Sequence, residues 1–298
     1  MRSGLRRDST GSRRDVREMI VKLEQASRLD RIGDRLQRVV LKVLRPQRVR
    51  DFLHGVWLGH PLHPAMVQVP IGAWTSSAML DLMPGQQRAA DALLTVGTAA
   101  ALPTAVAGLN DWASLSREQR RVGLVHAMSN TVGVGLFVAS LAARMRGDYQ
   151  RGRVLSFLGL TAATGGAYLG GHLAYKQGAA VNSGVPDLRH ISEGWHSVAE
   201  FAALPEAELV NRQIGHVGVL LYREGDRVSA LLDRCAHQSG PLSQGRIVRV
   251  DGQVCVMCPW HGSTYQLSDG EVVHGPAGTD QQVLPTRVVD GMVQARLP

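Results

Sequence analysis

Two short segments near the C-terminus, Cys235-Ala-His237 and Cys258-Pro-Trp-His261, constrain how the last third of this chain folds. Each segment carries one thiol and one imidazole, which are common ligands of transition metals. All four side chains can reach one metal centre only if the two segments face each other across it. The tips of hairpins on a β scaffold can meet this requirement, so the pattern predicts a β-sheet domain around a metal site.

Two kinds of metal centre use two Cys and two His. A 2Fe–2S cluster takes two Cys on one iron and two His on the other, and a structural zinc ion takes all four in a tetrahedron. Common zinc fingers place two Cys together and two His together, whereas each segment here mixes the two. The mixed spacing favours the 2Fe–2S cluster, with zinc as the alternative.

The residues around these segments have the composition and spacing that are typical of short β-strands. Runs rich in Val, Leu and Ile are separated by turn-forming pairs of Gly with Asp. The runs lie at 217–222, 228–232, 247–250, 254–257 and 288–289 with Val293, and the turn signals at 224–226, 251–252, 269–270 and 290–291. This pattern predicts a small all-β domain over 197–298.

The second segment extends to Cys258-Pro-Trp-His-Gly-Ser-Thr-Tyr265 and is followed by Asp269-Gly270 and Gly275-Pro276-Ala277. This series resembles the Rieske family over about residues 197–298. The resemblance implies a 2Fe–2S cluster whose buried iron is bound by Cys235 and Cys258 and whose outer iron is bound by His237 and His261. It also implies that the loop with Pro276 covers the cluster.

Two features of the sequence indicate which branch of the Rieske family the chain resembles. Gly240 and Trp260 stand where respiratory Rieske proteins have two disulfide-linked cysteines, so the resemblance is to the ferredoxin-like branch. Ser263 and Tyr265 nevertheless match hydroxyl groups that, in the respiratory branch, donate hydrogen bonds to the cluster sulfurs. Such hydrogen bonds stabilise the more negative, reduced cluster. We therefore expect an intermediate or raised reduction potential.

The chain has three cysteines, all between positions 235 and 258. An odd number of cysteines clustered in one region does not indicate a disulfide framework. The third cysteine, Cys255, precedes the second segment on an expected strand, where we expect a buried core thiol rather than a ligand.

Four apolar stretches of about 20 residues precede the β domain, at 65–83, 89–109, 122–143 and 154–175. That length crosses a hydrocarbon core roughly 30 Å thick. Gly, Ala, Ser and Thr are frequent within the stretches, which lets membrane helices approach closely. We therefore expect an all-α bundle of four transmembrane helices over 51–176, with a soluble bundle of very apolar helices as the alternative.

Four histidines lie near the ends of these stretches: His60, His63, His126 and His172. The motif His60-Pro-Leu-His63-Pro resembles an uncharacterised bacterial four-helix membrane family over about residues 28–178, which implies topology but no activity. Ionisable groups within a membrane bundle are candidates for function. One hypothesis is that these histidines ligate a haem b or line a quinone site, and the alternative is that they cap helices or sit at the membrane interface.

Positive charge is concentrated at the N-terminus. Residues 1–50 hold 15 Lys and Arg against 6 Asp and Glu, while the whole chain has a net charge of +8. We expect a disordered basic tail over 1–15 and a basic amphipathic helix over 16–50 that lies on anionic membrane lipid or packs on the rest of the protein. No nucleic-acid-reading motif accompanies the charge, so nucleic acid is not an expected partner.

Charge also predicts the topology. The basic N-terminus favours a cytoplasmic location, and four spans would return the C-terminus to the cytoplasm of a bacterial inner membrane. The third connector does not fit this topology, because it would lie on the outer side of the membrane although it is basic. Its basic residues are Arg144, Arg146, Arg151 and Arg153.

Taken together, these patterns predict a multi-domain protein in which the transmembrane bundle is followed, after a linker over 177–196, by the Rieske domain. We expect a membrane-anchored carrier that moves electrons between a membrane donor, either quinol or haem, and an unidentified cytoplasmic partner protein. It would be the electron-transfer component of an oxidoreductase system rather than a complete ring-hydroxylating oxygenase, whose two-His, one-carboxylate iron domain we do not find. The alternative is a redox sensor in which the cluster gates or stabilises the membrane domain.

Overall fold

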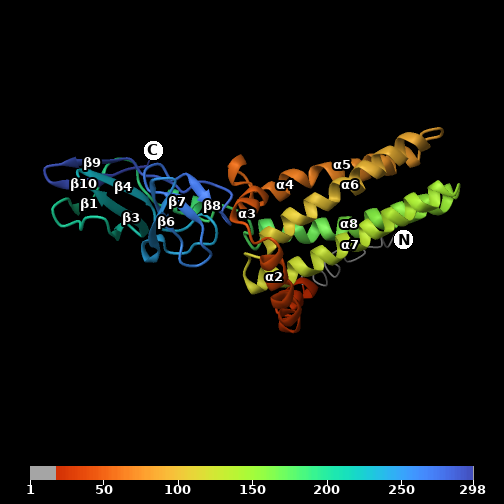
Figure 1. Cartoon of the computed structure of the whole chain (residues 1–298), viewed down its shortest axis with the longest axis horizontal. Coiled ribbons are helices and arrows are strands. Elements are labelled where there is room, and N and C mark those ends of the chain that lie inside the picture. Colours follow the sequence, from red (N-terminus) through yellow and green to blue (C-terminus); the bar gives the residue numbers. More distant parts are fainter. Residues whose placement is uncertain (1–17, 298) are drawn as a thin grey trace, which may run out of the picture. The chain divides into compact units, whose positions relative to one another are not determined.

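The computed structural model describes residues 18–297, so the expected tail over 1–15 and the start of the amphipathic helix lie outside the described residues. The chain divides into two compact units, which are considered one at a time below (Figure 1). The first unit contains residues up to Val43, Val69–Ala105 and Leu115–Ala179, and the second contains Leu44–Gln68, Val106–Ser114 and Ala180–Pro298.

Long helices form most of the first unit: α5 (Gln68–Asp81), α6 (Gln87–Trp112), α7 (Arg117–Met145) and α8 (Tyr149–Tyr175). The last three are each long and apolar enough to cross a membrane. α5 has 14 residues, a length of about 21 Å, and follows the short α4 (Leu62–Met66). The stretch expected as the first span therefore forms a shorter helix than the other three.

The bundle is held by small residues and by one aromatic pair. A Cβ atom on Gly133 of α7 would lie 3.1 Å from the carbonyl oxygen of Gly159 on α8, so the two backbones pack closely. Trp74 of α5 stacks on Phe137 of α7 with 4.4 Å between ring centroids. Many large apolar side chains instead face outward, among them Leu102, Val132, Val138, Leu158 and Tyr168. An exposed apolar surface of this kind is typical of helices that face lipid.

A buried ion-pair network joins the helix ends at 81–91 and 144–153. Arg144 of α7 donates from Nη1 to Asp81 Oδ1 at 2.9 Å and to Asp91 Oδ1 at 2.8 Å. The side chains of Arg144 and Asp81 are 1% and 0% exposed. Arg153 Nε lies 4.0 Å from Asp81. Two of the four arginines that oppose the expected topology thus have acidic neighbours inside the bundle.

The expected amphipathic helix over 16–50 is divided into shorter pieces. A helix over 18–24 is followed by η1 (Ser27–Leu29), α2 (Asp30–Val43) and, after Pro46, α3 (Gln47–His54) of the second unit. The first break falls at Ala26, whose ψ of 70° is not helical. The second falls before α3, where Pro46 has no N–H to donate.

Within the first unit, ion pairs attach these N-terminal pieces to the bundle. Arg121 Nε of α7 donates to Asp30 Oδ1 at 2.7 Å, and Glu24 Oε1 lies 2.8 Å from His172 Nε2 of α8. Apolar side chains such as Ile32 and Val39 remain more than half exposed, at 59% and 56%. The pieces therefore pack on their own protein and still present apolar surface.

The second unit contains ten strands in the part of the chain that the structure describes, in three antiparallel sheets with the orders β1-β10-β9, β2-β3-β4 and β5-β6-β7-β8. Their bounds are β1 His196–Glu200, β2 Leu209–Ile214, β3 Val217–Glu224, β4 Arg227–Leu232, β5 Arg246–Val250, β6 Gln253–Met257, β7 Thr264–Gln266, β8 Val272–His274, β9 Thr286–Val289 and β10 Met292–Ala295. The five expected runs all fall on strands. Hairpin turns follow the expected Asp-Gly signals, since Asp251 and Gly252 have φ of 48° and 83°.

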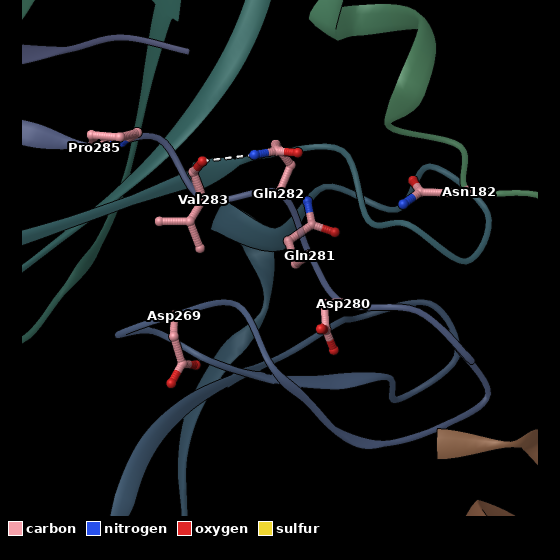
Figure 2. A pocket seen from close by; sticks show the side chains of 7 residues that line it. All are labelled: Asn182, Asp269, Asp280, Gln281, Gln282, Val283 and Pro285. Carbon is pink, nitrogen blue, oxygen red and sulfur yellow. Dashed lines mark hydrogen bonds between the residues drawn. The ribbon is translucent and has the colours of Figure 1, made fainter. Parts of the chain in front are cut away.

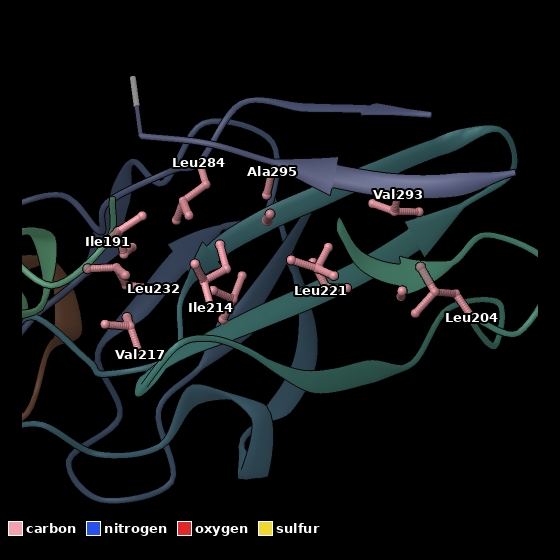
Figure 3. Close-up of a cluster of buried hydrophobic side chains, with 13 residues drawn as sticks. Ile191, Leu204, Ile214, Val217, Leu221, Leu232, Leu284, Val293 and Ala295 are labelled. Carbon is pink, nitrogen blue, oxygen red and sulfur yellow. The ribbon is translucent and has the colours of Figure 1, made fainter. Parts of the chain in front are cut away.

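A hydrophobic core packs between the first two sheets (Figure 3), with Leu221, Leu232 and Val293 fully buried. Ile191 is also in this core and is 5% exposed. The expected linker over 177–196 therefore contributes to the β unit, with the short α9 (Val185–Leu188) in its middle. Its Gly and Pro content indicated a loop, but only the tertiary structure shows that the loop is packed.

The buried network at Arg144 gives a stability prediction. We expect Arg144→Leu to lower the stability of the bundle by about 3–5 kcal/mol, because it leaves Asp81 buried without its counter-charge. The check is thermal unfolding of the purified protein in detergent. Arg146→Leu is the control, because Arg146 is exposed, and equal effects of the two variants would contradict the prediction.

Candidate metal centre

The two ligand segments occupy tight loops at the ends of β4 and β6. In the first loop, Cys235 N donates to Gly240 O at 2.9 Å and Ser239 N donates to Cys235 O at 3.0 Å. In the second, Cys258 N donates to Ser263 O at 2.8 Å and Gly262 N donates to Cys258 O at 3.1 Å. Each loop thus closes on its own cysteine and holds the sulfur close to the backbone.

The structure arranges the four expected ligands as two like pairs, while no three His, Cys, Asp or Glu side chains in the described part of the chain are grouped as they would be around a single metal ion. The thiols of Cys235 and Cys258 are hydrogen-bonded partners, and both residues are buried at 1% and 3% exposure. The rings of His237 and His261 are 5.0 Å apart between centroids and nearly perpendicular. His237 is buried and His261 is exposed. Two sulfurs inside and two imidazoles further out match a centre with two metal ions better than one tetrahedral zinc ion.

The local environment favours the ligand forms of these groups. The hydrogen bond from Cys235 lowers the pKa of Cys258 to about 6, while the same contact and burial raise the pKa of Cys235. Burial lowers the pKa of His237 to about 3 and also lowers the pKa of His261. These shifts favour neutral imidazoles and an ionised Cys258 thiol, which are the forms that bind metal.

Two further observations test whether a 2Fe–2S cluster fits. His237 Nδ1 is buried and has no hydrogen-bond partner among the described residues, so its lone pair is free for a metal. A Cβ atom on Gly240 would lie 2.7 Å from Cys258 Sγ and 3.1 Å from the ring of Trp260. The glycine therefore leaves room beside the sulfurs, and the donor set of two thiols and two imidazoles suits the cluster.

The two expected tuning hydroxyls lie beside the site. Tyr265 Oη is 3.3 Å from Cys235 Sγ and the residue is fully buried. Ser263 Oγ accepts a hydrogen bond from Ala277 N at 3.0 Å, so it also holds the loop that contains the buried Pro276. Burial raises the pKa of Tyr265, so its hydroxyl keeps the proton with which it can donate to sulfur.

Gln281 is a functional residue that the sequence did not indicate. Its Oε1 accepts from Ala236 N at 3.0 Å, and its Nε2 donates to Leu232 O at 2.6 Å and to Arg234 O at 2.9 Å. One buried side chain therefore fixes the backbone on both sides of Cys235. A single glutamine outside any motif gives no signal of this role in a sequence.

Figure 2 shows Gln281 at the wall of an open pocket. The other lining residues are Asn182, Asp269, Asp280, Gln282, Val283 and Pro285. None of the four expected ligands lines this pocket, and Gln281 turns its amide toward the first ligand loop instead.

The four histidines of the haem or quinone hypothesis fall two in each unit. In the first unit, His126 Nδ1 lies 2.7 Å from Gly166 O and His172 contacts Glu24. In the second unit, His60 is exposed, and the ring of His63 lies 2.8 Å from the position of a Cβ on Gly108. The contacts of His126 and His172 are those of side chains that tie helices together.

Comparisons with known proteins agree with this site and fold. Residues 194–286 match the Rieske [2Fe-2S] domain family, and residues 59–183 match a family described as predicted membrane protein (DUF2231). The anthranilate 1,2-dioxygenase ferredoxin subunit of Burkholderia cepacia is 31% identical over 103 residues, which cover 35% of this chain and 92% of that protein. The oxygenase component of dicamba O-demethylase from Stenotrophomonas maltophilia is 42% identical over 82 residues but is matched over only 22% of its length.

Among solved structures, the ferredoxin of carbazole 1,9a-dioxygenase from Nocardioides aromaticivorans IC177 is similar to 36% of this chain and to 100% of its own. The sequence identity is 20% and the TM-score is 0.32.

The fold and the site thus define an iron–sulfur protein with a ferredoxin-type electron-transfer domain and an attached membrane domain. The chain belongs to the Rieske [2Fe-2S] family through residues 194–286, and residues 59–183 match the family of predicted membrane proteins DUF2231. Membership in the Rieske family implies a 2Fe–2S cluster, whereas the comparisons give no support for a haem.

The tuning hydroxyls give a prediction about the reduction potential. We expect Tyr265→Phe and Ser263→Ala to lower the midpoint potential, because each removes a hydroxyl that stabilises the more negative, reduced cluster. Protein-film voltammetry of the purified variants measures this. Cys255→Ser, on the buried face of β6 away from the ligand pairs, is the control, and unchanged midpoints in both hydroxyl variants would refute the prediction.

Gln281 gives a second prediction. We expect Gln281→Leu to be isolated with less iron per chain and to lose its cluster faster, because backbone groups near Cys235 lose buried hydrogen bonds whose absence costs about 1–3 kcal/mol each. Iron content and the decay of visible absorbance are the measurements. Gln282→Leu is a matched control, since the side-chain amide of Gln282 donates to the neighbouring Val283 O at 2.9 Å and not to the backbone beside Cys235. The prediction fails if both variants retain the wild-type iron content.

Proposed function

We propose that this protein is a membrane-anchored Rieske electron carrier. Cys235 and Cys258 bind the inner iron of its 2Fe–2S cluster, and His237 and His261 bind the outer iron. The protein passes electrons between a donor in the membrane and a cytoplasmic partner protein.

The observation that carries the proposal is the pairing of the ligands: buried thiol beside buried thiol, imidazole beside imidazole. The bound cluster supplies one-electron transfer. The chain's own residues then have distinct tasks. The two loops hold the sulfurs, Tyr265 and Ser263 adjust the potential, and burial keeps water from the inner end.

An exposed edge supports the role of carrier. His261 is exposed, and the neighbouring Trp260 is 57% exposed. A large aromatic side chain beside an exposed ligand is a suitable contact for a protein partner. The relatives that match include a ferredoxin subunit of a dioxygenase. By analogy, the partner of this chain is a redox protein that docks over Trp260 and His261.

The membrane donor that we favour is a quinol. The comparisons give no support for haem, and the rings of His126 and His172 already have partners in the bundle. Anaerobic addition of a short-chain quinol to the oxidised protein in nanodiscs tests this choice. Bleaching of the cluster supports a quinol donor, and a spectrum that does not change assigns the donor role to a soluble protein.

We also propose a location in the bacterial inner membrane with both termini in the cytoplasm. The basic N-terminal segment supports this orientation, and the buried contacts of Arg144 give that residue a structural role beside the bundle's carboxylates. Single cysteines at Gln86 and Gly147 test the orientation with a membrane-impermeant thiol reagent in intact spheroplasts. Both positions lie on the outer side in the proposed orientation, so both cysteines should be labelled. Protection of both would indicate the opposite orientation.

The ligand assignment is tested by spectroscopy of the full chain. We expect the dithionite-reduced protein to give the EPR signal of a Rieske cluster with about two iron and two sulfide per chain. Cys258→Ser and His261→Ala should abolish that signal, because each iron then lacks one of its two protein ligands. Cys255→Ser should keep it. A colourless wild-type protein that contains one zinc per chain would overturn the proposal.

A further inference from the structure

Four residues outside the matched Rieske region lie against the cluster site: Asp51, His54, Asp111 and Ser114, here called the collar. Asp51 and His54 belong to α3, Asp111 is near the end of α6, and Ser114 follows that helix. All four belong to the same compact unit as the β domain. Their contacts divide into one with a ligand ring and several with the loop at Gly275.

The contact with the ligand is made by Ser114. Its Oγ lies 3.5 Å from His237 Nε2 and donates a hydrogen bond to Asp111 O at 2.7 Å. A hydroxyl has one proton, so with that proton given to Asp111 the oxygen accepts from His237. The proton of the imidazole is thereby assigned to Nε2.

The other ring nitrogen is then left for the metal. His237 Nδ1 is buried and without a hydrogen-bond partner among residues 18–297. A ligating histidine commonly donates its second N–H to an oxygen, which fixes the tautomer and the ring orientation. Ser114 has this relation to His237, although it lies 121 positions before Cys235 in the chain.

The remaining collar residues hold the loop that closes the site. Asp51 Oδ1 accepts from Gly275 N at 2.9 Å, and its Oδ2 lies 2.9 Å from His274 Nδ1. His54 is 1% exposed, and its Nδ1 lies 2.7 Å from Asp111 Oδ1. A Cβ on Gly275 would lie 2.7 Å from His54 Cδ2, so the ring packs directly on the loop.

The collar is a continuous chain of contacts. It starts at the ring of His237, passes through Ser114 to Asp111, and continues through His54 to Gly275. It therefore connects one ligand ring with the loop that contains Pro276. His237 is 8% exposed as a result, while His261 stays exposed.

We propose that the collar completes the cluster site, with Ser114 as the positioning residue of the His237 ligand. The inference rests on the proposed function, because it assigns His237 as a ligand of the outer iron. Two consequences follow. The collar sets part of the reduction potential, and it leaves His261 as the ligand that an external partner reaches.

The first test compares Ser114→Ala with Ser114→Thr in the full chain. An acceptor on Nε2–H makes the imidazole a stronger donor to iron and stabilises the more positive, oxidised state. Ser114→Ala should therefore raise the midpoint potential and change the ¹⁵N coupling of one histidine in pulsed EPR of protein labelled with ¹⁵N-histidine. Ser114→Thr retains the hydroxyl and should restore both values toward wild type.

Ser183→Ala is the matched control for this comparison. Ser183 Oγ donates to the backbone carbonyl of His237 at 3.2 Å and does not contact its ring. The control should leave the ¹⁵N coupling unchanged. If Ser114→Ala has the wild-type potential and coupling, or if Ser114→Thr departs from wild type as far as Ser114→Ala does, the inference is wrong.

A second test needs no variant and applies even if Ser114→Ala fails to take up its cluster. Diethylpyrocarbonate modifies accessible imidazole nitrogens, and its adducts on each peptide can be followed by mass spectrometry. In brief treatment of the wild-type protein with its cluster, His261 should react and His237 should be protected. Equal rates of modification of His237 and His261 would contradict the proposal that the collar encloses His237. A wild-type protein without a Rieske EPR signal would instead refute the proposed function, so the two failures are distinguishable.

Discussion

The structure of the β unit depends on one geometric constraint: two separate loops must each deliver a sulfur and a nitrogen to opposite ends of one centre. The β-sheets meet this constraint because adjacent hairpins hold their tips at a fixed separation. A Cβ on Gly240 would lie 2.7 Å from Cys258 Sγ, so the glycine lets the backbone of the first loop approach that sulfur. Gln281 then fixes the backbone of the first loop through three hydrogen bonds. Each of these features helps to keep the two ligand loops at the separation that one centre requires.

Burial differs strongly across the site and gives its two ends different chemistry. The sulfur end lies in a buried cluster of mostly apolar side chains, where Tyr265 supplies a hydroxyl close to a sulfur. At the imidazole end, His237 is enclosed and His261 is exposed. Low polarity around the inner end strengthens each hydrogen bond there. In the proposed function, the exposed His261 shortens the path to a partner, while Tyr265 beside the sulfurs and Ser114 beside His237 adjust the potential.

The helical unit follows other rules, because lipid gives no hydrophobic driving force between helices. Its helices are joined by small-residue contacts such as Gly133 with Gly159 and by the aromatic pair of Trp74 and Phe137. The buried Arg144 network joins the ends of these helices, and removal of one partner would leave a buried charge without its counter-charge. Outward-facing apolar side chains complete a surface suited to lipid.

Much of this protein is determined by its sequence alone. The spacing of Cys235, His237, Cys258 and His261 identified the β domain and its cluster chemistry, because metal ligands impose residue type and order. The Asp-Gly turns located the hairpins, because only residues that tolerate positive φ fit there. Long apolar runs indicated three of the helices, since the thickness of a bilayer sets their length. Four strands were not predicted, namely β1, β2, β7 and β8. The last two have three residues each, which are too few for a recognisable pattern.

Other features were decided by the tertiary structure. The packing of the residues expected to form a linker, the buried contacts of Gln281 and the approach of Ser114 to His237 all join positions far apart in the chain. No local pattern marks such residues, because a hydroxyl or an amide acquires its role only from the groups that folding places beside it. The sequence identified the candidate metal ligands, and the tertiary structure decided which side chains hold those candidates in place.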